Sequence, residues 1–126
     1  MASVLIIDDE KEICREFQEI MEDEGHEVHT ATRGKQGIEM VRSRKIELVF
    51  LDVLMPGMEG REVYEEIRKF SDVPVVIMSG YMPQHKEAEV LHLGASACLK
   101  KPLDLKEVRE LVSTIIAQRN SAGRPK

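Results

Sequence analysis

The stretch VLIIDDEKEICREFQEIMEDEG, residues 4–25, holds one strand, one helix and the acids between them. Residues 4–7 are continuously apolar, which predicts a short buried strand. From residue 10 to residue 24 the apolar side chains recur at helical spacing, and Gly25 is a typical residue to end a helix. Asp8 and Asp9 follow the strand directly, where two adjacent negative charges repel each other and need a reason to be there.

The same strand-and-helix unit repeats along the chain. Strands are expected at residues 4–7, 27–31, 48–54, 73–78 and 97–99, and helices at residues 10–24, 35–44, 62–69, 84–93 and 104–119. Strands that are apolar throughout are typical of a parallel sheet with helices on both faces. The alternation therefore predicts an α/β fold, a (βα)5 flavodoxin-like sandwich whose five-stranded parallel sheet has the order 2-1-3-4-5.

Length and composition narrow the class of protein. The chain has 126 residues, is 42% hydrophobic and carries a net charge of -5, which suits one compact domain and argues against nucleic-acid binding. We expect that domain at residues 1–119, with residues 120–126 as a polar tail or the start of a linker. Because Cys14 and Cys98 form no disulfide framework and no apolar run could span a bilayer, a cytoplasmic protein without a membrane partner is expected.

Acids follow two of the predicted strands. Asp8 and Asp9 come after the first strand, and Asp52 interrupts the otherwise apolar third. In the order 2-1-3-4-5 these strands are neighbours, so the carboxylates would converge on one crevice at the carboxyl edge of the sheet. A hard divalent cation, Mg²⁺ or Mn²⁺, would neutralise them. Two simpler interpretations stay open: Asp8 and Asp9 as helix caps, and Asp52 as a turn residue after a strand that ends at Leu51.

Two more polar side chains follow the remaining strands. Ser79 comes after the fourth strand and offers a hydroxyl, and Lys101 comes after the fifth and offers a compact positive charge. An aspartate nucleophile, a metal ion, an ammonium group and a hydroxyl are the parts needed to move a phosphoryl group onto a carboxylate.

Four motifs in order resemble those of a known family. They are IIDDE (6–10), LDVLMPGMEG (51–60), IMSG (77–80) and LKKPL (99–103). Together they resemble the response-regulator receiver domain of two-component signalling, of the chemotaxis-regulator type, over residues 3 to about 119. The resemblance implies a phosphoprotein that catalyses only its own phosphorylation and dephosphorylation and is otherwise not an enzyme. It also implies a histidine kinase or phosphotransfer protein as donor, and a small phosphodonor as an alternative.

The resemblance assigns roles to single residues. Asp52 matches the phosphoacceptor. Asp9 matches a direct metal ligand, Asp8 a ligand acting mostly through water, and the backbone carbonyl of Leu54 a further ligand. Lys101, directly before Pro102 and in a bond that is usually cis in this family, matches the invariant lysine.

The resemblance also implies a switch. Ser79 matches the switch hydroxyl, which would change the face formed by the fourth helix, fifth strand and fifth helix. An output domain or protein would bind this face, and a homodimer could form on phosphorylation. The aromatic residue that moves in many members is replaced here by Cys98. We expect Tyr81, two residues after Ser79, to substitute for it in part, and the resemblance implies that Leu54 lies at a position that tunes the reaction.

Three other functions fit the sequence less well. A phosphatase of the haloacid-dehalogenase type expects a second acid two residues after the nucleophile, where this chain has Leu54. FMN binding needs a glycine- and hydroxyl-rich loop after the first strand, where DDEKE would instead repel phosphate. A degenerate receiver that serves only as an interaction module is disfavoured by the complete set of acid, hydroxyl and lysine.

Overall fold

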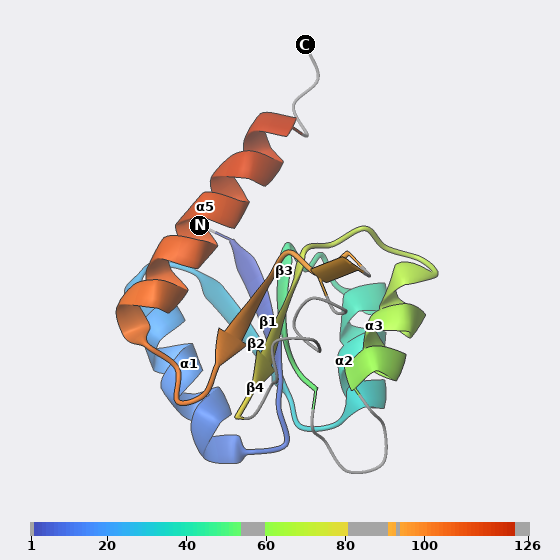
Figure 1. Ribbon diagram of the computed structural model, residues 1–126, viewed down its shortest axis with the longest axis horizontal. Coiled ribbons are helices and arrows are strands. Elements are labelled where there is room, and N and C mark those ends of the chain that lie inside the picture. Colours follow the sequence, from blue (N-terminus) through green and yellow to red (C-terminus); the bar gives the residue numbers. More distant parts are fainter. Residues whose placement is uncertain (1, 54–59, 81–90, 93, 123–126) are drawn as a thin grey trace.

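Five parallel strands form one sheet, in the order β2-β1-β3-β4-β5, in a computed structural model of the protein (Figure 1). The structure describes residues 2–53, 60–80, 91–92 and 94–122, with residues 120–122 described by their backbone alone. The predicted fold and strand order are confirmed. The strands are β1 (Ser3–Ile7), β2 (Glu27–Ala31), β3 (Leu48–Asp52), β4 (Val75–Ser79) and β5 (Ala97–Lys100).

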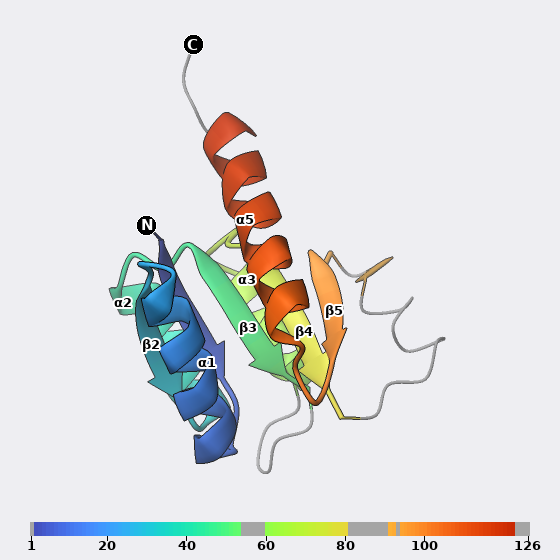
Figure 2. The ribbon, with the colours of Figure 1, turned by 90° about the vertical axis from the view of Figure 1, so that its left-hand side faces the viewer.

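Helices cover both faces of this sheet. They are α1 (Lys11–Asp23), α2 (Gly34–Ser43), α3 (Gly60–Arg68) and α5 (Leu105–Ala122). Figure 1 shows α1 and α5 on one face and α2 and α3 on the other, and Figure 2 shows α1 and α5 in front of the sheet. The helix expected at residues 84–93 lies outside the described residues, apart from residues 91 and 92, which are helical.

Alternate residues of each strand feed two separate apolar cores. Val4 and Ile6 of β1 pack with residues of α1 and α5, whereas Leu5 and Ile7 pack with residues of α2 and α3. All four side chains are fully buried. Because side chains of a strand point alternately to the two faces, a continuously apolar strand is what this sandwich requires.

Some elements begin or end at other residues than expected. β3 ends at Asp52, two residues early, and β4 begins at Val75, two residues late, after Pro74, which has no N–H to donate. α3 begins at Gly60, two residues earlier than expected. α5 continues to Ala122, since the sequence after residue 119 has no helix breaker before Gly123.

The sequence predicts no membrane-spanning segment, and the helices of the structure bear on this expectation. Among the described residues, no helix is long and apolar enough to cross a bilayer.

Candidate functional site

Two aspartates meet at the carboxyl edge of the sheet. β1 and β3 are paired in parallel, with Ile7 opposite Leu51, so Asp8 follows β1 at the level where Asp52 ends β3. Asp8 is fully buried and Asp52 is 3% exposed. Burying an isolated carboxylate costs several kcal/mol, which is comparable to the free energy of unfolding of a whole domain. Both aspartates therefore need a positively charged partner.

Lys101 supplies that partner. Its backbone N–H donates to the carbonyl of Ser79 over 2.8 Å, which ties the end of β5 to the end of β4. The bond between Lys101 and Pro102 is cis, as predicted. The ammonium Nζ lies 2.7 Å from Asp8 Oδ2, 3.2 Å from Asp52 Oδ2 and 3.2 Å from Glu10 Oε1.

The charge state of Lys101 follows from these contacts. Partial burial alone would lower the pKa of Lys101, but the contact with Asp8 and the charge of Asp52 outweigh it, so the pKa is raised above its ordinary value. The side chain is therefore a permanent cation between acids. It neutralises part of the charge that the buried aspartates carry.

Asp8 uses its two carboxylate oxygens differently. Oδ1 accepts the backbone N–H of Glu10 over 2.9 Å, just before α1 begins. The N-cap residue of α1 is Glu10, and no side chain makes a capping hydrogen bond there, so Asp8 and Asp9 do not cap the helix as the simpler interpretation expected. Oδ2 is buried and, among the described residues, has no hydrogen-bond partner, since the contact with Lys101 Nζ is an ion pair without hydrogen-bonding geometry. Asp8 thus holds the backbone just before α1 and still presents one oxygen to the site.

The oxygens at this edge fit a divalent cation. Ligand oxygens of Asp8, Glu10 and Asp52 all lie within 4.8 Å of one another. A set made only of carboxylate oxygens suits Mg²⁺ or Mn²⁺ better than a softer metal, and the buried Oδ2 of Asp8 has coordinating capacity left.

Asp9 lies apart from this set. Its side chain is exposed, and it is not among the acids that the structure groups together. Its role as a direct metal ligand stays a prediction.

Glu10 is the residue that sequence reasoning missed. We expected it only as the first residue of the helix, but it is the extended residue before α1, with φ -87° and ψ 106°. In extended backbone, side chains two residues apart point to the same side. The spacing of Asp8 and Glu10 in DDE was therefore the signal that could have revealed it.

The switch residues are only partly described. Ser79 ends β4, beside β3, and is fully buried. Cys98 lies in the middle of the edge strand β5, is half-buried and packs against the apolar core on the α2 and α3 side. Leu54 and Tyr81 lie outside the described residues, so their roles stay predictions.

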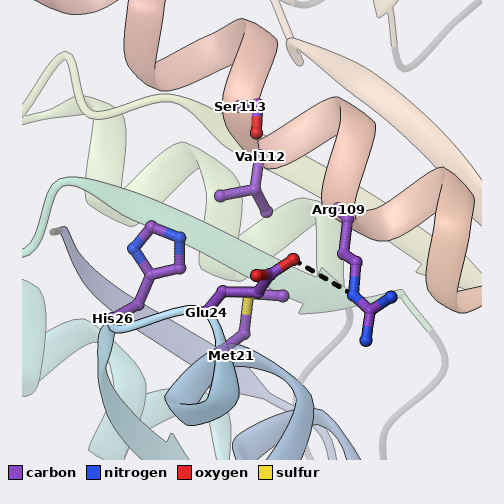
Figure 3. Close-up of a pocket in the computed structure, with 6 residues that line it drawn as sticks. All are labelled: Met21, Glu24, His26, Arg109, Val112 and Ser113. Atoms are coloured by element: carbon purple, nitrogen blue, oxygen red, sulfur yellow. Dashed lines mark ion pairs between the residues drawn. The ribbon is translucent and has the colours of Figure 1, made fainter.

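A separate pocket of about 220 Å³ lies between α1, the start of β2 and α5 (Figure 3). Arg109 Nε on α5 is 3.1 Å from Glu24 Oε1 at the end of α1, and this ion pair joins two of the residues that line the pocket. None of the lining residues belongs to the acidic edge, so this pocket is distinct from the candidate site. The lining residues are Met21, Glu24, His26, Arg109, Val112 and Ser113.

Comparison with known families and proteins agrees with the geometry. The family model described as "Response regulator receiver domain" matches residues 4–113. The Transcriptional regulatory protein CpxR homolog of Haemophilus influenzae is 34% identical over 116 residues, which are 92% of this chain and 51% of that protein. The Transcriptional regulatory protein ZraR of Klebsiella oxytoca is 32% identical over 123 residues, 97% of this chain and 28% of that protein. The chain therefore spans about half of the first relative and less of the second.

Solved structures give the same result for the fold. The response regulator receiver domain protein (CheY-like) from Methanospirillum hungatei JF-1 has a TM-score of 0.91 and 25% sequence identity, and the match covers 97% of this chain and 98% of that one. A two-component response regulator from Clostridium difficile has a TM-score of 0.90 and 26% identity, over 95% of this chain and 99% of that one.

Proposed function

The chain belongs to the response regulator receiver domain family, and from this premise we propose that it is a phosphorylation-dependent switch whose phosphoacceptor is Asp52. The observation that carries the proposal is the pairing of a buried carboxylate with a resident ammonium: Asp52 is 3% exposed, and Lys101 Nζ is 3.2 Å from its Oδ2. Packing alone does not call for a charged side chain at the buried carboxyl end of a central strand, since its burial is costly. A nucleophile, in contrast, must be an ionised carboxylate.

The proposed reaction transfers a phosphoryl group from a donor molecule to Asp52. A carboxylate oxygen of Asp52 forms a bond to phosphorus while the bond from phosphorus to the donor breaks, and the leaving group keeps that electron pair. The donor is the phosphohistidine of a kinase or phosphotransfer protein, or a small acyl phosphate. The ammonium of Lys101 offsets the negative charge of the transferred group, and the hydroxyl of Ser79 donates to one of its oxygens.

A divalent cation completes the proposed site. Mg²⁺, when bound, neutralises charge on the phosphoryl oxygens and orients them. Asp8 and Asp52 are the buried acids that would hold it, with Asp9 and the backbone carbonyl of Leu54 as the further ligands that family membership suggests. The same acids explain why the ion is needed, because phosphorylation adds charge to an edge that is already negative.

The phosphoryl group would bias a two-state element. Ser79 ends β4, next to the sheet edge formed by β5, so a pull on its hydroxyl reaches the face that includes β5 and α5. We propose this face, with the helix expected at residues 84–93, as the surface for an output domain or protein and for a homodimer. In this proposal the receiver domain is residues 1–119, and residues 120–126 lead away from it as a tail or the start of a linker.

Our first prediction is that Asp52 takes up one phosphoryl group. Acetyl phosphate with Mg²⁺ should add the mass of one phosphoryl group to the intact protein, and Asp52→Asn should abolish the gain because its amide is not a nucleophile. Asp72→Asn is the matched control, since it makes the same substitution at a side chain that is 99% exposed.

Two outcomes would reject the assignment. Undiminished labelling of Asp52→Asn would mean that another residue accepts the group. Many turnovers of phosphate release from small phosphate esters would instead favour a phosphatase of the haloacid-dehalogenase type.

A further inference from the structure

Lys101 has one more carboxylate partner than the proposed reaction uses. Two of its partners, Asp8 and Asp52, are buried, and the third, Glu10, is 59% exposed on the solvent side. The ammonium donates hydrogen bonds to Glu10 Oε1 and Asp52 Oδ2, each over 3.2 Å, and forms an ion pair with Asp8. The side chain of Lys101 itself is 11% exposed, and Glu10 is the most exposed of its three carboxylate partners.

The ammonium and a divalent cation compete for the same oxygens. The three acids that contact Lys101 Nζ are also the three whose oxygens lie within 4.8 Å of one another. A divalent cation bound by Asp8 and Asp52 repels a positive charge placed against both of them. Lys101 must therefore give up at least part of its contact with the buried acids when the metal ion enters.

Glu10 is the acid that can keep Lys101 as the metal ion enters. Its carboxylate sits on a longer side chain than those of Asp8 and Asp52 and is solvated, so it can follow the ammonium outward. Its negative charge lies directly before α1, where the start of a helix carries partial positive charge.

We propose that Glu10 is a positioning residue for Lys101: it retains the ammonium at the mouth of the acidic edge when a divalent cation binds Asp8 and Asp52. Glu10 thereby strengthens cation binding indirectly, because the displaced lysine still has a partner, and it keeps the lysine within reach of a phosphoryl group on Asp52. This inference rests on the proposed metal site, but it concerns cation binding alone and needs no phosphorylation.

A double-mutant cycle on Mg²⁺ binding, measured by calorimetry without phosphodonor, tests the inference. The variants are Glu10→Gln, Lys101→Met and the double variant. Glu12→Gln is the matched control, since Glu12 is 79% exposed on α1 and pairs with Arg15 instead. Glu10→Gln should weaken Mg²⁺ binding roughly threefold to tenfold, as expected for a partly exposed contact, whereas Glu12→Gln should change it by less than about twofold.

The effect of Glu10→Gln should shrink to that of the control when Lys101 is already Met. A loss of equal or greater size in the Lys101→Met background would overturn the inference, because Glu10 would then act on the metal ion directly. No loss in the wild-type background would overturn it as well. Circular dichroism of each variant verifies the fold.

A second readout follows Lys101 itself. In the presence of saturating Mg²⁺, the NMR cross-peak of the Lys101 ammonium group should be observable in the wild type and in Glu12→Gln, and broadened or lost in Glu10→Gln. Unchanged cross-peaks in all three proteins would contradict the positioning role. If Asp52 proved not to be phosphorylated, the proposed function would fail while both of these results stood.

Discussion

Lys100 and Lys101 are neighbours in sequence with different surroundings. Lys101 contacts the acids of the site, whereas Lys100 ends β5, opposite Ser79, with an exposed side chain. We predict that Lys101→Ala folds but loses the phosphorylation response, while Lys100→Ala responds nearly normally, because Lys101 contacts Asp52 and Lys100 is an exposed residue of β5. Phosphoryl uptake by intact mass and the change in a partner-binding assay measure the response. Equal responses of the two variants would remove the assignment of Lys101.

His26 links the start of β2 to the first residues of the chain. Its Nδ1 accepts the backbone N–H of Ala2 over 3.1 Å, which requires that this nitrogen carries no proton. Burial, aided by the positive N-terminus, lowers the pKa of His26 below its ordinary value, against the opposing charges of Glu24 and Glu47. Arg109 faces it across the pocket. Acid should therefore weaken this contact.

Protonation of His26 links this contact to the pH dependence of stability. The folded state binds a proton at His26 less tightly than the unfolded state. The contribution of neutral His26 to the free energy of unfolding is therefore complete above the unfolded pKa of about 6.5, and it is lost as the pH falls through the lowered pKa of the folded state. His26→Asn keeps an acceptor but cannot titrate. Urea unfolding at pH 7.5 and pH 5 should show the wild type losing more free energy than His26→Asn, by about 0.5 kcal/mol or less since the ring is partly exposed. Identical losses in both proteins would contradict this.

The residues at the site were predictable to different degrees. Asp52 could be predicted because one charge in an apolar strand stands out, and Lys101 because it precedes a proline at a strand end. The contact between Glu10 and Lys101 could not, because it joins residues 91 positions apart and depends on the extended backbone before α1. Sequence periodicity reports local geometry and not such distant pairs.

At the scale of elements, the start of α3 rests on the end of β3. The backbone N–H of Gly60 donates to the carbonyl of Val53 over 3.2 Å, and a Cβ at Gly60 would lie 2.4 Å from Val53 Cα. Backbone cannot move aside as a flexible side chain can. The first residue of α3 and the residue that follows β3 therefore approach at a distance that only glycine permits.

We predict that Gly60→Ala lowers the free energy of unfolding by roughly 1–3 kcal/mol, as overpacking does. Gly80→Ala is the matched control, because a Cβ there meets no atom of the described residues within 4 Å, and its effect should stay within about 0.5 kcal/mol. Urea denaturation of both variants measures the difference. A Gly60→Ala variant as stable as Gly80→Ala would mean that α3 can shift without cost.

Element types were easier to predict than element ends. Apolar periodicity identified every strand, and Asp104 was correctly expected to cap α5, since its Oδ1 accepts the N–H of Lys106 over 2.9 Å and that of Glu107 over 3.2 Å. The end of β3 could not be predicted, because apolar residues continue in the sequence beyond Asp52, whereas the carbonyl of Val53 already accepts the N–H of Gly60 in α3. Hydrophobicity marks what is buried, whether or not it is strand.

At the scale of the whole molecule, two cysteines differ enough to report on the switch. Cys14 is 5% exposed, and burial, with the charge of Asp8, raises its pKa to about 11. Cys98 is half-buried on the edge strand. Because thiolates are the reactive form, Cys98 should be alkylated well before Cys14.

We predict that beryllofluoride with Mg²⁺, which mimics the phosphorylated state, changes the alkylation rate of Cys98. The reason is that β5 pairs with β4, whose last residue is Ser79. Measurement by mass spectrometry in Cys14→Ala leaves one thiol, and Mg²⁺ without beryllofluoride is the control. If the rates agree within error while calorimetry confirms binding, Cys98 does not sense the switch and the proposed output face loses this support.

The position of β5 at the margin of the sheet has a consequence for amide hydrogen exchange. β1 and β3 have a paired strand on either side, so their backbone amides should exchange with solvent only when the whole molecule unfolds. Among the strands that the structure describes, β5 is paired on one side, so it can open locally at lower free energy. The strand that ends in Asp52 is thus as durable as the fold itself, while the strand nearest the proposed output can rearrange alone. Slow amide exchange in β1 and β3, together with faster exchange in β5, would show this difference between strands of one sheet directly.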